Sequence, residues 1–245
     1  MKNRIHKLIL DLIFPPVCAF CGQRLSPRRR HRVCDECLKA LKYCRDFNRC
    51  TRCGKPIPDE AVGICKNCYS HRFYAFKITS AFVYADVARN GVLRFKREKN
   101  KSDAKIFASY VAGMVKFDFP AVEFEAVVSV PPRNTVGNRD MYDQAEKLAT
   151  ETALLLDLPY LKKAMRRNRR TKRQSSLNYI QRIQNVKDCF EVIKKETVKN
   201  KTILLIDDVG TTCASIEECA KALKEAGAYQ VYAATIATVP ALEMS

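Results

Sequence analysis

The sequence predicts an α/β protein with a mostly parallel sheet flanked by helices, preceded by a small cysteine-rich module. Short apolar runs bounded by turn residues, with helical apolar periodicity between them, predict the sheet and its helices. The cysteines predict the module, because nine of the twelve lie before residue 69. We therefore divide the 245-residue chain into residues 1–72, an N-terminal helix and the cysteine-rich module, and residues 73–245, the α/β domain.

The opening segment, residues 1–14, is basic and partly apolar, as secretory signals are. Asp11 interrupts its apolar run and no small-residue cleavage site follows, so we expect a short packing helix. No stretch approaches the ~18 apolar residues that are needed to cross a bilayer. These features predict a cytoplasmic protein without membrane insertion.

Eight cysteines form two units, each made of two C-x2-C pairs. Twelve residues lie between the two pairs of the first unit, and eleven lie between those of the second. Thiolates two residues apart converge in a tight turn, and two such pairs supply four tetrahedral ligands. The predicted ligands are Cys18, Cys21, Cys34 and Cys37 in the first cysteine unit and Cys50, Cys53, Cys65 and Cys68 in the second. Two structural zinc ions are expected, because four thiolates leave no position for water or substrate.

Several alternatives for these cysteines stay open from spacing alone. A disulfide framework is the rival to zinc, although paired units without a secretion signal favour metal. A redox role is weaker, since redox pairs usually occur singly. Each zinc could take its ligands from one unit or from both. Cys44 has no partner in either arrangement and is expected to pack in the interior.

The elements of the α/β domain follow in order after Ile78. Residues 80–85 are predicted as a strand, and residues 87–97 and 105–117 as helices. Residues 126–130 form a second short strand that two prolines end. Beyond a loop, Asp143 and Glu146 begin a helix whose leucines and alanines point inward, and strands and helices alternate afterwards.

Residues 203–212, ILLIDDVGTT, say most about function. The apolar run is predicted as a strand buried on both faces, which ends where Asp207 and Asp208 leave the sheet. A helix is expected to begin at Ser215, with Glu218 at the capping-box spacing. An acidic pair beside hydroxyls and the free N–H groups of a helix start suits a sugar phosphate with a divalent cation. The alternative is an ordinary strand, turn and helix whose acids are solvated.

This segment resembles the signature of type I phosphoribosyltransferases, an acidic pair followed by Thr-Thr-Gly-x-Thr. The resemblance implies a phosphoribosyltransferase-like domain that binds phosphoribosyl pyrophosphate (PRPP), or a related phosphorylated ribose, with Mg²⁺. Asp207 and Asp208 would hold the ribose hydroxyls as the catalytic acids. The residues that would wrap the 5′-phosphate are Thr211, Thr212, Cys213, Ala214 and Ser215. Cys213 stands where the family has glycine, which adopts positive φ without steric cost.

Two further segments resemble the competence protein F (ComF) family. After the second strand, residues 133–139 form a loop before the matching Tyr142, Asp143 and Gln144, although Asp140 and Met141 replace the usual Arg-Gly. The resemblance implies that Arg133 and Arg139 bind pyrophosphate in this loop. The other segment matches the family at Arg170, Thr171, Gln174, Leu177, Arg182, Asn185 and Phe190.

Positive charge is concentrated near that last segment. The chain carries a net charge of +18, and residues 158–187 hold ten Lys or Arg and no acid. Such a run attracts polyanions through counterion release, and single-stranded DNA is the expected partner. The residues predicted to form a hood or to contact nucleic acid are Arg166, Arg167, Arg169, Arg170 and Arg182. A solvated loop, or a lid over a phosphorylated substrate, is the equal alternative.

The resemblance implies a ComF-type protein that binds PRPP and magnesium and acts in DNA uptake during natural transformation. It would handle single-stranded DNA beside proteins of the competence machinery. Whether the chain turns over as a phosphoribosyltransferase is left open. The main alternative is an inactive transferase fold that binds nucleic acid, and a weaker one is a nucleotide salvage enzyme.

Overall fold

We analysed a computed structural model, which describes residues 15–26, 29, 31–58, 63–69, 73–98, 101–133, 143–171 and 177–241. Several predicted features lie outside these residues. They are the N-terminal helix, Arg139, the pair Asp140 and Met141, Tyr142 and Gln174.

The main sheet has four parallel strands in the order β1-β6-β5-β2. These strands are β1 (Ile78–Val83), β2 (Ala126–Ser129), β5 (Thr202–Gly210) and β6 (Gln230–Thr238). A small antiparallel sheet joins β3 (Met165–Arg167) to β4 (Phe190–Val192). The predicted α/β class with a mostly parallel sheet is confirmed.

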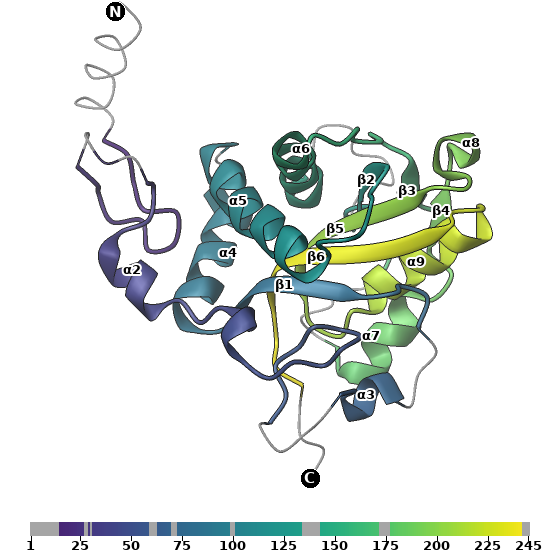
Figure 1. The fold of residues 1–245 in the computed structure, drawn as a ribbon, viewed down its shortest axis with the longest axis horizontal. Helices are drawn as coiled ribbons and strands as arrows, with labels where there is room; N and C mark the ends of the chain where they lie inside the picture. Colours follow the sequence, from purple (N-terminus) through teal and green to yellow (C-terminus); the bar gives the residue numbers. More distant parts are fainter. Residues whose placement is uncertain are drawn as a thin grey trace, which may run out of the picture.

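Helices cover both faces of the main sheet (Figure 1). One face carries α4 (Asp86–Glu98), α5 (Lys101–Asp118) and α6 (Gln144–Leu156), and the other carries α7 (Tyr179–Val186) and α9 (Ala214–Glu225). Successive residues of β5 serve the two sides in turn: Leu204 lies in the core with α5, and Leu205 in the core with α9. A short helix, α8 (Lys195–Val198), precedes β5. Across the described part of the chain, we find no helix that combines the length and apolarity of a bilayer span.

The cysteine-rich module contacts both cores. It contains α2 (Asp35–Ala40), a 3-10 turn η1 (Cys44–Asp46) and α3 (Lys66–Tyr69). The first cysteine unit lies beside α4, and the chain of the second passes below β1 in Figure 1. The ring of Phe20, from the first unit, lies 5.2 Å from that of Phe107 on α5. Ile57, from the second unit, belongs to the core on the α9 side.

The strand β5 and the helix α9 differ from expectation at the predicted site. β5 continues to Gly210, because β6 provides partners for it as far as Thr238. The prediction that Asp207 and Asp208 leave the sheet is therefore wrong. α9 begins at Ala214 without a side-chain cap, so the predicted capping box at Ser215 is wrong too. Glu218 accepts a hydrogen bond from the Asp188 N–H instead, at 2.7 Å.

Candidate functional site

Each cysteine unit forms a cluster of its own, which settles the ligand pairing that spacing left open. Within each cluster, the four Sγ atoms lie within 4.8 Å of one another. Cys21 and Cys34 are 3.7 Å apart at sulfur, as are Cys53 and Cys65. Four thiolates bound tetrahedrally at zinc lie about 3.8 Å apart, whereas disulfide sulfurs lie about 2.05 Å apart. The clusters are consistent with two structural zinc ions.

Backbone groups support the thiolates of both clusters. The Cys34 N–H donates to Cys18 Sγ at 3.4 Å, and the Cys65 N–H donates to Cys50 Sγ at 3.3 Å. Such hydrogen bonds disperse thiolate charge and orient the ligands. Cys44 belongs to neither cluster and is fully buried, and burial raises the pKa of its thiol to about 12.

Asp207 and Asp208 lie near the carboxyl end of β5, where the sheet is open on one side. Asp207 pairs with Thr235 of β6. On the other side β2 ends at Ser129, opposite Ile206. The acids therefore extend past the end of β2, at the edge where ligands bind in parallel sheets.

The two carboxylates have different surroundings. Asp208 forms an ion pair with Lys96 of α4, at 2.8 Å. Burial would lower the pKa of Lys96, but the charge and hydrogen bond of Asp208, together with the charge of Asp207, raise it. Burial, with the Asp208 charge added, raises the pKa of Asp207 to about 7. Burial also raises the pKa of Asp143, the N-cap of α6, to about 6. The Lys96 ammonium thus lies near two carboxylates, those of Asp207 and Asp208.

The residues present fit a magnesium ion that is carried by its substrate. Mg²⁺ commonly takes one or two protein carboxylates and completes its octahedron with water and phosphate oxygens. Asp207 and Asp208 would be those two carboxylates. The groups of three or more metal-ligating side chains found in the described ranges are the two cysteine clusters, so the acids form no closed cage.

The loop of residues 211–215, predicted to bind phosphate, is shaped by Cys213 and held by Lys55. Cys213 has φ +60°, so it adopts the left-handed conformation that the glycine of the related signature would favour. The Thr212 hydroxyl accepts a hydrogen bond from the Ala214 N–H at 3.3 Å. The ammonium of Lys55, which is 6% exposed, donates to the Thr211 carbonyl. The second cysteine unit thus places a buried positive charge against this loop.

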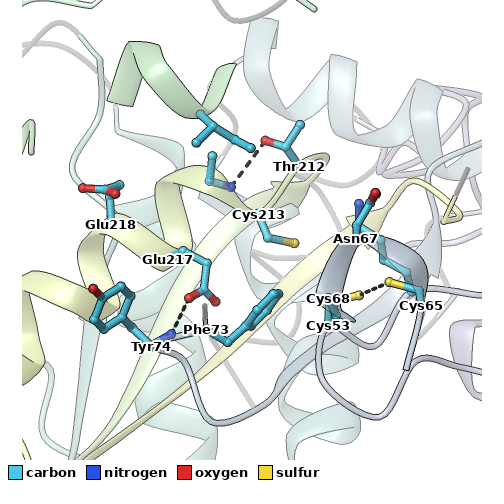
Figure 2. A pocket seen from close by; sticks show the side chains of 13 residues that line it. Cys53, Cys65, Asn67, Cys68, Phe73, Tyr74, Thr212, Cys213, Glu217 and Glu218 are labelled. Atoms are coloured by element: carbon cyan, nitrogen blue, oxygen red, sulfur yellow. Dashed lines mark hydrogen bonds between the residues drawn. The ribbon is translucent and has the colours of Figure 1, made fainter. Parts of the chain in front are cut away.

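A pocket of about 110 Å³ lies between the loop of residues 211–215 and the second cysteine unit. Figure 2 shows Cys213 and Glu217 on one side and the cysteines Cys53 and Cys65 on the other. Glu217 Oε2 accepts from the Tyr74 N–H at 2.6 Å, while its buried Oε1 has no partner among the described residues. Burial raises the pKa of Glu217 to about 7.

The predicted basic residues occupy different environments. Arg167 is 8% exposed: its Nε donates to the Pro131 carbonyl at 3.1 Å, and its guanidinium lies 4.4 Å from the Phe190 ring centroid. It braces the start of the loop after β2, where Arg133 is the last described residue. The others are at the surface or half-buried: Arg166 pairs with Glu191, Arg169 and Arg182 donate to the carbonyls of Lys187 and Leu177, and Arg170 is exposed.

Sequence reasoning missed Lys96 and Lys55. Lys96 lies in a basic helix end far from Asp208 in the chain, and its role depends on how α4 packs. Lys55 follows a C-x2-C pair and a glycine, a place where a lysine carries no functional signal of its own. Both contacts join distant segments, so no local pattern could predict them.

Comparison with known proteins agrees with both halves of the chain. A double zinc ribbon domain model matches residues 9–69. Over 87% of its length, the chain is 25% identical to competence protein F of Haemophilus influenzae, and it covers 93% of that protein. It is also 25% identical to competence protein ComFC of Bacillus subtilis, over 91% of each chain. The predicted resemblance to the competence protein F family is confirmed.

Solved structures with a similar fold include two proteins of phosphoribosyl chemistry. The glutamine PRPP amidotransferase of B. subtilis is 21% identical with a TM-score of 0.36, and the match covers 62% of this chain. This chain spans 28% of the amidotransferase. Adenine phosphoribosyltransferase of Saccharomyces cerevisiae is 12% identical with a TM-score of 0.35, over 59% of this chain and 82% of that chain.

Proposed function

We propose that this protein is a ComF-type phosphoribosyltransferase-family protein that binds PRPP with magnesium and handles single-stranded DNA during DNA uptake. The observation that carries the proposal is the acidic pair beyond the end of β2, next to a loop in which Cys213 has a glycine-like backbone. The names of the two competence relatives support the cellular role.

Each part of the site has a task in this proposal. Asp207 and Asp208 hold the ribose hydroxyls, and residues 211–215 hold the 5′-phosphate with N–H groups and hydroxyls. Arg133 and Lys96 supply positive charge for the pyrophosphate. Magnesium, when bound, neutralises part of the pyrophosphate charge. Such a site accelerates transfer by positioning and electrostatics rather than through a covalent nucleophile.

A second candidate is an inactive transferase fold that binds nucleic acid. Two departures from the family pattern favour it: Cys213 replaces glycine, and Asp140 and Met141 replace Arg-Gly. Burial raises the pKa of the Cys213 thiol to about 11, so the side chain brings no charge to the loop. The two candidates differ in whether PRPP binds at all.

Calorimetry with PRPP and magnesium separates the two candidates. We expect binding heat from the wild type and none from Asp207→Asn/Asp208→Asn, because the ribose loses both carboxylate acceptors. Asp157→Asn is the matched control: Asp157 has φ +56° at the end of α6, a conformation that asparagine tolerates. Absence of binding heat from the wild type favours the inactive module. Binding heat from the double variant equal to that of the wild type contradicts the roles assigned to Asp207 and Asp208.

The DNA part is tested on three basic residues at the surface, Arg166, Arg169 and Arg170. Replacing all three with alanine is expected to weaken binding of a single-stranded oligonucleotide and to flatten its salt dependence. Arg167 is left in place, because its buried hydrogen bond to Pro131 makes it a structural residue. If the affinity for the oligonucleotide changes neither with salt nor with these substitutions, the basic hood is not the DNA-binding surface.

A further inference from the structure

A groove of about 590 Å³ lies at the amino edge of the main sheet, the end opposite to Asp207 and Asp208. The residues before β1, the second cysteine unit, the end of α9 and the start of β6 line it. We call it the amino-edge groove and define it by Arg52, Phe73, Phe76, Lys77, Lys224 and Tyr229.

The charge of the amino-edge groove favours an anion. Three of its lining residues are cations, Arg52, Lys77 and Lys224, and none is an acid. Arg52 lies 5.8 Å from the Phe73 ring centroid, and Lys224 Nζ donates to the Tyr229 carbonyl at 2.5 Å, so two cations are held in place. A neighbouring depression, which shares Tyr229, carries Glu123 and Glu125. An anion would therefore favour the amino-edge groove over this depression.

Its aromatic residues favour unpaired bases. Phe76 is 60% exposed and Tyr229 is 70% exposed, although large aromatic side chains usually bury most of their surface. The Phe76 ring lies 5.2 Å from that of Tyr232, and its N–H donates to the Val231 carbonyl at 2.7 Å. Such anchored, exposed rings between cations are the arrangement on which bases of a single strand stack while its phosphates meet Lys and Arg.

We propose that the amino-edge groove binds single-stranded nucleic acid, with bases stacked on Phe76 and Tyr229 and phosphates held by Arg52 and Lys224. The inference rests on the proposed handling of single-stranded DNA and gives it a second surface, away from the basic hood and the sugar-phosphate site. A strand in this groove leaves the carboxyl edge free, so nucleic acid and PRPP bind at the same time.

A single tryptophan tests the stacking directly, because the chain has none of its own. We expect oligothymidylate to quench the fluorescence of Tyr229→Trp and to leave Phe117→Trp unchanged. Phe117 is the matched control, since it is 58% exposed on α5. Equal quenching of both variants, no quenching of Tyr229→Trp, or equal quenching by a duplex of the same length would overturn the proposal.

Loss variants test the same groove by fluorescence anisotropy of a labelled oligonucleotide. Phe76→Ala and Tyr229→Ala are each expected to lower affinity on the order of tenfold. Arg52→Ala/Lys224→Ala is expected to reduce the slope of log K against log salt by about 1.4. Lys105→Ala/Lys116→Ala removes the same charge from the exposed face of α5 and should leave both quantities unchanged. Thermal melting verifies that every variant is folded.

The outcomes separate this inference from the proposed function. If only the Arg166, Arg169 and Arg170 substitutions weaken DNA binding, the groove is ruled out and the hood stands. If the wild type binds no single-stranded DNA, both fall. Groove variants that lose binding to anionic vesicles as strongly as binding to oligonucleotide would also overturn the proposal. PRPP heat retained by Tyr229→Ala, together with weaker DNA binding, supports two separate sites.

Discussion

Asp207 and Asp208 are neighbours on one strand, yet their carboxylates have different surroundings. Their side chains leave opposite faces of β5, so one meets buried surroundings and the other meets Lys96. Asp207 Oδ1 also accepts a hydrogen bond from the Asp208 N–H at 2.8 Å. The Lys96 ammonium occupies the place beside Asp208 where a metal cation would gain most from the acids.

In the proposed site, Lys96 would therefore compete with magnesium for Asp208. In the absence of PRPP, we expect Lys96→Met to bind Mg²⁺ several-fold more tightly than the wild type, because one cation no longer opposes another. Thermal-shift titration with MgCl₂ measures this as a lower midpoint concentration. Lys105→Met is the matched control on the exposed face of α5. Identical midpoints in all three proteins would argue against competition.

Glu217 makes stability depend on pH. Burial raises its pKa from 4.5 to about 7 in the folded state. As the pH rises, the unfolded state releases this proton first, so the folded state binds more protons between the two values and stability falls. The fall is at most roughly 1.4 kcal/mol per pH unit from this one group.

We expect Glu217→Gln to remove this part of the pH dependence. The amide still offers an acceptor for the Tyr74 and Ala75 N–H groups, which Glu217 binds at 2.6 and 3.3 Å. Urea unfolding at pH 6 and pH 8, where zinc stays bound, should show a smaller loss of stability for the variant than for the wild type. An equal loss of stability between pH 6 and pH 8 in the variant and the wild type would contradict the assignment.

Helix α4 and the first cysteine unit pack closely against each other at Gly91. A Cβ at Gly91 would lie 2.6 Å from Phe20 Cδ1 and 3.2 Å from its Cα.

Sequence patterns predicted α4, α5, α6 and β2 to within a few residues, since periodicity and caps are local signals. They missed the length of β5, because β6 supplies the partner that extends it.

Gly91→Ala tests this close contact. Alanine favours helix over glycine by about 1 kcal/mol, but here the methyl group displaces Phe20, and overpacking costs about 1–3 kcal/mol. We expect a lower free energy of unfolding. Gly113→Ala on α5 is the opposite case, since no atom lies within 4 Å of the added Cβ, and it should raise stability. Urea unfolding of both variants checks the two signs.

The two cysteine units join the cores on opposite sides of the sheet. Phe20 and Leu25 of the first unit belong to the core with α5, and Cys50 and Ile57 of the second belong to the core with α9. Spacing predicted both zinc clusters, because four converging thiolates are a local signal. It did not predict that the two units pack on opposite sides of the sheet, because this arrangement depends on long-range packing. The domain boundary at residue 72 remains a prediction.

Removing zinc should therefore destabilise the whole chain. Structural zinc contributes folding free energy directly, and here both clusters support surfaces of the α/β domain. We expect a chelator to lower the melting temperature of the helical circular dichroism signal in a single transition, and metal analysis to find about two zinc ions beforehand. An unchanged transition after complete zinc removal would show that the domain folds without the module.

The position of β6 limits when the protein can fold during synthesis. β6 lies between β1 and β5 in the sheet, yet among the described strands it is the last to be made. Until its residues leave the ribosome, β1 has no partner strand in the main sheet and one edge of β5 is unpaired. The zinc clusters are complete by Cys68, so they can bind metal on the nascent chain long before the surfaces that they brace exist. Maturation thus begins with metal capture and ends with insertion of the final strand.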